Sequence, residues 1–120
     1  MQMHISADDP SISDIEASAQ KIINAGFLLH FSEMDVSMNP SASKTSFDQH
    51  DLDEQRDRYY AIVKLYSGFN KNYLYGITLW GVGDGDSWIP ESFHRADIPL
   101  LFDTNYDIKP AYCGFKEALQ

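Results

Sequence analysis

The stretch Phe27–Val36, FLLHFSEMDV, decides how this chain is expected to fold. It begins as an apolar run directly after Gly26, which is typical of a short buried strand. It ends in two acids, Glu33 and Asp35, whose spacing places both side chains on one face of a strand. Two adjacent carboxylates at the end of a buried strand are costly unless they are paired, hydrogen-bonded or used in chemistry. The alternative is that the strand has already ended and both acids are solvated.

The segment before this stretch indicates a strand followed by a helix. Residues 1–6 alternate, with Gln2 and His4 on one face, as in the last part of a strand. A chain that begins inside a strand suggests to us that a longer protein has been truncated. Residues 11–14, SISD, fit a capping box, and an apolar stripe at three- and four-residue spacing follows until Gly26 ends the helix.

The rest of the chain predicts two helices around one further strand. A polar loop leads to a helix expected at residues 51–68, and the apolar residues 73–80 predict the next strand. A glycine-rich loop follows at residues 81–88, and Pro110 opens a last helix that ends near Leu119. The predicted order is βαβαβα, an α/β fold with parallel strands and right-handed crossovers.

Ligands of such folds bind at the carboxyl ends of the strands. Each predicted strand carries unusual residues near that end, in chain order Gln2 and His4, Glu33 and Asp35, and Trp80 with Trp88 nearby. This convergence favours a functional role for the two acids over simple solvation.

Composition limits the size, the partners and the cysteine chemistry of the chain. Its 120 residues, 43% of them hydrophobic, suffice for one core. Nine basic and 18 acidic side chains give a net charge of −9, which disfavours nucleic-acid binding. No apolar run reaches the length of about 18 residues that crosses a membrane, and residues 1–6 lack the features of a signal peptide. Cys113 is the only cysteine, which excludes an intrachain disulfide and a cysteine-rich zinc site.

Four spaced motifs resemble, in order, those of glycoside hydrolase family 10, the endo-1,4-β-xylanases with a (β/α)8 barrel. The motifs are MQMH at 1–4, SEMD at 32–35, WGVGDGDSW at 80–88, and LLFDTNY with KPAY between 100 and 112. They resemble the sixth strand, the seventh strand with the nucleophile, the end of the eighth strand, and the entry to the last helix. The resemblance implies that residues 1–120 are one partial catalytic domain, the C-terminal portion of a TIM barrel with strands 6–8.

Departures from the family pattern are mild within the motifs. Ser32 replaces the usual threonine, Met34 the usual leucine, and Gly83 stands where threonine or alanine is common, so no reactive group is lost. The family's first five strands are absent, and with them the general acid/base glutamate and its neighbouring asparagine on the fourth strand. Such a barrel needs about 250 residues. We therefore expect a chain that is inactive alone and that associates with the missing N-terminal half or with a second copy.

The resemblance implies a retaining mechanism in which Glu33 is the nucleophile. It also implies that His4 donates a hydrogen bond to Glu33 and that Asp35 holds the imidazole in its tautomer and orientation. Retaining hydrolysis needs a second carboxyl about 5–5.5 Å from the nucleophile. Considered without the family, His4 is more typical of a hydrogen-bonded structural histidine. The parent enzyme is expected to be secreted, whereas the compartment of this chain stays open.

The implied substrate is xylan or a xylo-oligosaccharide, bound by Gln2, Trp80 and Trp88. Indole faces pack against the apolar faces of pyranose rings, while the indole N–H can donate to a hydroxyl. The alternative for Trp80 is a place in the core. Trp88 lies among small and polar residues and has less reason to be buried.

No metal or cofactor is expected. Asp84 and Asp86 resemble part of a calcium loop, but the pattern is incomplete and we expect them to order their loop by hydrogen bonds. His30, His50 and His94 lack metal-ligand spacing and are expected to be structural or exposed. Two other functions stay open, a small carbohydrate-binding module that does not cleave and a different β-1,4-glycanase of the same barrel group.

Overall fold

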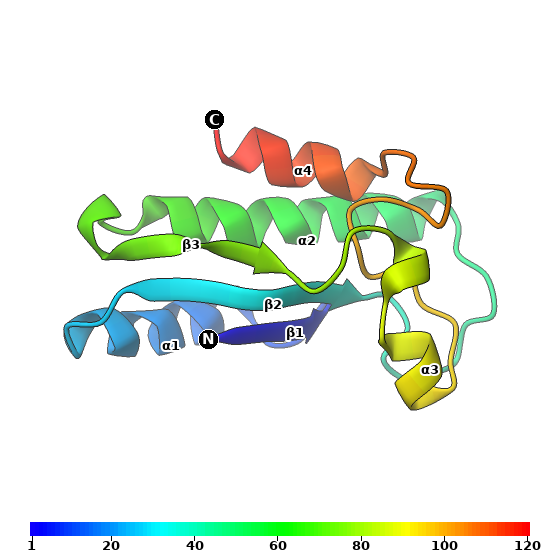
Figure 1. Cartoon of the computed structure of the whole chain (residues 1–120), viewed down its shortest axis with the longest axis horizontal. Coiled ribbons are helices and arrows are strands. Elements are labelled where there is room, and N and C mark those ends of the chain that lie inside the picture. Colours follow the sequence, from blue (N-terminus) through cyan, green and yellow to red (C-terminus); the bar gives the residue numbers. More distant parts are fainter.

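The computed structural model describes all 120 residues and contains a parallel sheet of three strands in the order β1-β2-β3 (Figure 1). The strands are β1 (Gln2–Ser6), β2 (Leu29–Ser37) and β3 (Leu74–Leu79). The long helices are α1 (Ile12–Asn24), α2 (Gln49–Gly68) and α4 (Pro110–Ala118). Short helical turns are η1 (Lys71–Tyr73), η2 (Asp84–Asp86) and α3 (Ile89–Phe93). The predicted βαβαβα order is confirmed, with the short turns added in the connections.

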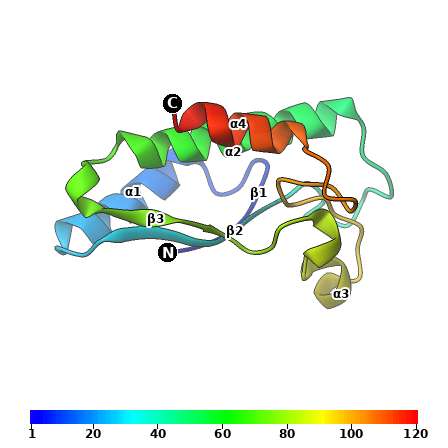
Figure 2. The same cartoon turned by 45° about the horizontal axis from the view of Figure 1, so that its top comes forward.

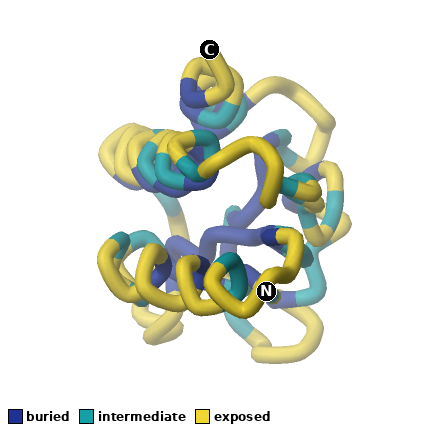
Figure 3. The backbone as a smooth tube through the Cα atoms, turned by 90° about the vertical axis from the view of Figure 1, so that its left-hand side faces the viewer, coloured by how far each residue is buried: buried dark blue, intermediate teal, exposed yellow.

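The hydrophobic core lies between one face of the sheet and the long helices. Its strand side comprises Met3, Ile5, Leu29, Phe31, Met34 and Val36, and its helix side includes Ile15, Ala19, Tyr59, Ile62 and Tyr66. Figure 2 shows α2 and α4 side by side on this face, and Figure 3 marks in dark blue the buried stretches of the strands and helices. None of the helices is both long and apolar enough to cross a membrane.

Helix α2 begins two residues before the expected Asp51 because Asp48 caps it. The Asp48 carboxylate accepts from the Asp51 backbone N–H at 3.1 Å, and the Asp51 carboxylate accepts from the Asp48 N–H at 3.0 Å. This reciprocal pair is a capping box, which satisfies two otherwise unpaired donors. The expected stripe is buried from Gln55 to Tyr66, but Leu52 is only half-buried and Asp51 takes its place.

A β-bulge in β2 corrects the strict alternation assumed for this strand. Ser32 pairs with Gln2 and Asp35 pairs with His4, so three steps along β2 oppose two along β1. Strict alternation from Phe31 would direct Glu33 and Asp35 into the helix-covered core. The extra residue shifts the pattern by one, so that Met34 enters the core. The backbone accommodates the extra residue at Glu33, whose φ is 55°. This value lies in the left-handed region, which residues other than glycine rarely adopt.

Candidate active site

The three strands point toward the same end of the molecule, where α3 lies (Figure 1). Contacts between side chains join all six residues expected there: Gln2, His4, Glu33, Asp35, Trp80 and Trp88. Parallel pairing of β1, β2 and β3 explains the cluster, because it brings the carboxyl ends of all three strands to one edge.

Both carboxylate oxygens of Glu33 have partners from β1. Gln2 Nε2 donates to Glu33 Oε1 at 2.9 Å, and His4 Nε2 lies 3.1 Å from Glu33 Oε2. The Glu33 side chain remains 27% exposed, so a ligand can reach it. The arrangement thus presents an oriented carboxylate at the surface of the sheet.

Asp35 lies on the other side of the His4 ring and is buried. Its Oδ2 is 3.1 Å from His4 Nδ1 and accepts the Trp88 indole N–H at 2.8 Å. Burial raises the pKa of Asp35, while the bond from Trp88 and the nearby imidazole oppose that shift. When Glu33 and Asp35 are both ionised, both ring nitrogens of His4 must donate, because a carboxylate only accepts. Asp35 therefore determines how the imidazole faces Glu33.

The two tryptophans differ in a way that the sequence did not indicate. Trp80 is 45% exposed and meets the His4 ring edge-on, with 6.0 Å between ring centroids. Trp88 is half-buried, its ring centroid lies 4.9 Å from that of His4, and its indole N–H donates to Asp35. Burial was less expected for Trp88 than for Trp80. Trp88 is nevertheless the more buried of the two, because its N–H has a buried partner.

The acids of the glycine-rich loop form hydrogen bonds within and beyond the loop, as expected. Asp84 accepts from the Leu100 N–H at 2.8 Å and is paired with Lys109. Asp86 accepts from the Gly83 N–H at 3.0 Å and from the Tyr106 hydroxyl at 3.1 Å. These contacts hold the loop that connects Trp80 to Trp88.

A second group of contacts at the end of β2 was not predicted. The buried Asp97 carboxylate accepts from the Ser37 hydroxyl and from the Met38 N–H, the latter at 2.8 Å. Arg95 Nε lies 3.6 Å from the same carboxylate. The signal available in the sequence was an Arg-Ala-Asp segment after a loop, which has no recognisable periodicity or motif. These residues fasten the long loop after β3 to the end of β2.

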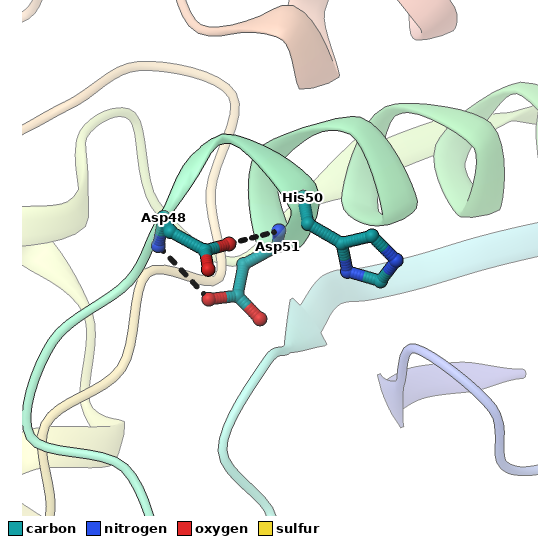
Figure 4. A group of neighbouring side chains, drawn as sticks. All are labelled: Asp48, His50 and Asp51. Atoms are coloured by element: carbon teal, nitrogen blue, oxygen red, sulfur yellow. Dashed lines mark hydrogen bonds between the residues drawn. The ribbon is translucent and has the colours of Figure 1, made fainter.

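One group of side chains could offer ligand atoms to a metal ion, at the start of α2. Asp48, His50 and Asp51 can place one such atom each within 4.8 Å of one another. Figure 4 shows the two aspartates joined by the capping hydrogen bonds, with His50 projecting away from them. Lys44 Nζ also donates to Asp51. The carboxylates are therefore engaged in capping and in an ion pair, outside the strand-end cluster.

The chain is similar in sequence to one family of known proteins. The model of glycosyl hydrolase family 10 matches residues 1–118. The chain is 35% identical over 132 residues to the endo-beta-1,4-xylanase Xyn10C of Cellvibrio japonicus, covering 98% of this chain and 22% of that protein. It is 30% identical to an endo-1,4-beta-xylanase of Geobacillus stearothermophilus, covering 93% of this chain and 36% of that protein.

Solved structures agree in fold as well as in sequence. Native xylanase 10C from Cellvibrio japonicus superposes with a TM-score of 0.88 at 34% identity, over 98% of this chain and 27% of that one. The catalytic core of a xylanase A superposes with a TM-score of 0.88 at 36% identity, over 99% and 39%. The three parallel strands and their helices thus have the arrangement of part of a TIM barrel, and the chain belongs to glycosyl hydrolase family 10.

Proposed function

We propose that residues 1–120 form the C-terminal part of the catalytic domain of a retaining endo-1,4-β-xylanase, with Glu33 as its nucleophile. The observation that carries the proposal is the placement of Glu33, whose two oxygens meet Gln2 Nε2 and His4 Nε2 at 2.9 and 3.1 Å. The relatives named as xylanases support the reaction class.

In the proposed reaction, the Glu33 carboxylate attacks the anomeric carbon as the bond to the leaving oxygen breaks. A second carboxyl group donates its proton to that oxygen and then removes a proton from the water that hydrolyses the glycosyl-enzyme ester. His4 and Gln2 orient the Glu33 carboxylate, and Asp35 fixes the His4 ring.

The second carboxyl group is proposed to come from outside this chain. Asp35 is unsuited to that role, because it is buried and its Oδ2 is bound to His4 and Trp88. The chain alone is therefore proposed to be inactive. The sheet order leaves β1 and β3 with one neighbour each, so each presents a free edge. The rest of the barrel, or a second copy of the chain, is proposed to pair with these edges.

Xylan or a xylo-oligosaccharide is the proposed substrate. A solved complex of xylanase 10C from Cellvibrio japonicus contains xylopentaose, and that protein is 34% identical to this chain. Trp80 offers an exposed indole beside His4, which suits packing against a pyranose ring. Trp88 and Gln2 complete the proposed sugar-binding surface.

The test combines the chain with the complementary N-terminal part of the Cellvibrio japonicus xylanase. We expect the combination, but not either part alone, to hydrolyse an aryl xylobioside, and a mechanism-based fluoro-sugar to add its mass to the peptide containing Glu33. Glu33→Gln should abolish hydrolysis, whereas Glu16→Gln, an exposed change on α1, should not. Labelling at another residue would refute the nucleophile assignment. Turnover by the chain alone would refute its inactivity, and xylan binding indifferent to Glu33 without any turnover would favour a carbohydrate-binding module.

A further inference from the structure

Four side chains of the long loop after β3, which contains α3 (Figure 1), contact one another in a row that leads to the candidate active site. Starting at the end of β2, they are Asp97, Arg95, Phe93 and Trp88. The last of them donates its indole N–H to Asp35 at 2.8 Å. The other three have no role in the reaction proposed above, so their arrangement calls for an explanation of its own.

Asp97 fixes the first part of the row to the end of β2. Its side chain is fully buried, and its carboxylate accepts from the Ser37 hydroxyl and from the backbone N–H groups of Met38 and Ile98, the last two at 2.8 and 2.9 Å. Arg95 supplies the positive charge, with Nε 3.6 Å from Asp97 Oδ2 and Nη2 donating to the Ser37 hydroxyl at 3.3 Å. Because a buried carboxylate is costly without such partners, the guanidinium has a defined position.

The Arg95 guanidinium in turn holds the ring of Phe93. His94, which has a left-handed backbone with a φ of 52°, ends α3 and turns the chain between these two residues. The guanidinium carbon lies 4.8 Å from the centroid of the Phe93 ring, within the range of about 6 Å for a cation–π contact. Phe93 is 48% exposed, so core packing alone does not confine its ring. The contact with Arg95 restricts it.

The Trp88 ring contacts two other rings. Its centroid lies 5.1 Å from that of Phe93, in an edge-on arrangement, and 4.9 Å from that of His4. Its indole N–H donates to Asp35 Oδ2, the same oxygen that lies 3.1 Å from His4 Nδ1. A half-buried indole keeps rotational freedom that a packed neighbour removes. Displacement of Trp88 would therefore withdraw a donor from Asp35 and alter the surroundings of His4.

We infer that Arg95 is a positioning residue of the candidate active site, which holds Trp88 on Asp35 through the ring of Phe93. The row begins at Ser37 and returns to Asp35, both on β2, so the strand itself is the frame against which Trp88 is held. The consequence for hydrolysis rests on the proposed function, whereas the position of Trp88 does not.

The test measures by NMR how fast the Trp88 indole N–H exchanges with water in the 120-residue chain. Arg95→Met should make this exchange about fivefold faster, the factor that corresponds to a lost contact of about 1 kcal/mol. Phe93→Leu should have an effect of similar size. The double variant should exchange no faster than Phe93→Leu alone, because Arg95 acts through Phe93. The carbon-bound ring protons of His4 should shift in each variant, because the Trp88 ring current acts on them.

Three controls separate positioning from a general loss of structure. Phe93→Tyr keeps the ring and should leave the exchange unchanged. Arg56→Met removes an ion-paired arginine on α2 and should also leave it unchanged. The exposed Trp80 indole N–H is the internal reference and should not respond in any variant. If Arg95→Met fails to fold, Arg95→Lys keeps a charge beside Asp97 but loses the planar guanidinium, and it should still speed the exchange.

Three outcomes would overturn the inference. The Trp88 exchange could stay at its natural rate in Arg95→Met and Arg95→Lys while urea denaturation shows a loss of stability, which would leave Arg95 with a purely structural role. The effects of Arg95→Met and Phe93→Leu could multiply, or the Trp80 signal could change as much as that of Trp88. Failure of the proposed function is read separately, from fluoro-sugar labelling of Glu33 in the combined protein, because the exchange measurement needs no turnover.

Discussion

Lys109 Nζ lies 2.9 Å from Asp84 Oδ2, and both side chains are almost completely buried. The same ammonium group donates to the backbone carbonyls of Ile98 and Leu100 at 2.7 and 2.8 Å. Burial raises the pKa of Asp84 and lowers that of Lys109, and the opposite charge of the partner opposes each shift. This pair joins the residue just before α4 to the loop between Trp80 and Trp88, so it holds that loop in place.

Replacing Lys109 with methionine should strongly destabilise the chain, because Asp84 would stay buried without its counter-charge. A broken buried pair costs about 3–5 kcal/mol of unfolding free energy. Urea denaturation followed by tryptophan fluorescence measures this loss. Lys116→Met, at an exposed lysine on α4, is the control and should change stability little. Adding Asp84→Asn should recover part of the loss, and equal stability of the Lys109 and Lys116 variants would contradict the role of the pair.

The bulge in β2 predicts an unusual order of stability among variants of Glu33. At a φ of 55°, alanine keeps the strain of the left-handed conformation, whereas glycine does not. Glu33→Gly should therefore unfold at a free energy about 1 kcal/mol higher than Glu33→Ala. At Ser32, which has no positive φ, the order should reverse. Finding alanine more stable than glycine at both positions would argue against the bulge.

Asp51 predicts a loss of stability in acid. The bond from the Lys44 ammonium, with the Asp48 N–H, lowers the pKa of Asp51 below its ordinary value of 3.8. The unfolded chain then binds the proton more tightly, so the stabilisation is present above pH 3.8 and is lost as the pH falls through the folded pKa. Asp51→Asn should cost about 0.5–1 kcal/mol near neutral pH, as expected for a charge at a helix start.

Denaturation at several pH values checks this prediction. The difference between the natural chain and Asp51→Asn should shrink as the pH falls below 3.8. Asp57→Asn, on the exposed side of the same helix, should show no such trend. A difference that is independent of pH would contradict the prediction, because the stabilisation by Asp51 would then not depend on its negative charge.

The contact between α2 and α4 predicts opposite effects of two glycine-to-alanine changes. A Cβ atom on Gly114 would overlap the backbone carbonyl of Arg56, so Gly114→Ala must push the helices apart. Gly68, at the end of α2, has open space around it. Gly114→Ala should cost about 1–3 kcal/mol, whereas Gly68→Ala should gain up to about 1 kcal/mol. Thermal unfolding of the two variants measures both changes in stability. A stabilising Gly114→Ala would contradict the close packing of α2 against α4.

Much of the fold, and the residues that form the candidate site, could be predicted from local patterns. The apolar stripe of α1 and the apolar run of β2 identified their elements, and parallel order then placed His4, Glu33 and Trp80 at one edge. The position of the bulge could not be predicted, because the apolar residues of Phe27–Val36 are divided equally between the two alternating faces of a strand, so they do not show where the alternation shifts. Its position depends on how β2 pairs with both neighbouring strands.

The sequence by itself determined the element order, the family motifs and the residue types available for chemistry, because periodicity and motif spacing are local properties of the chain. Only the tertiary structure decided that the Trp88 indole N–H donates to Asp35, that Lys109 pairs with Asp84, and that Arg95 lies against the buried Asp97. These relationships join residues that are far apart in the chain or depend on burial. Their energies come from desolvation and hydrogen-bond geometry, which exist only once the chain has packed.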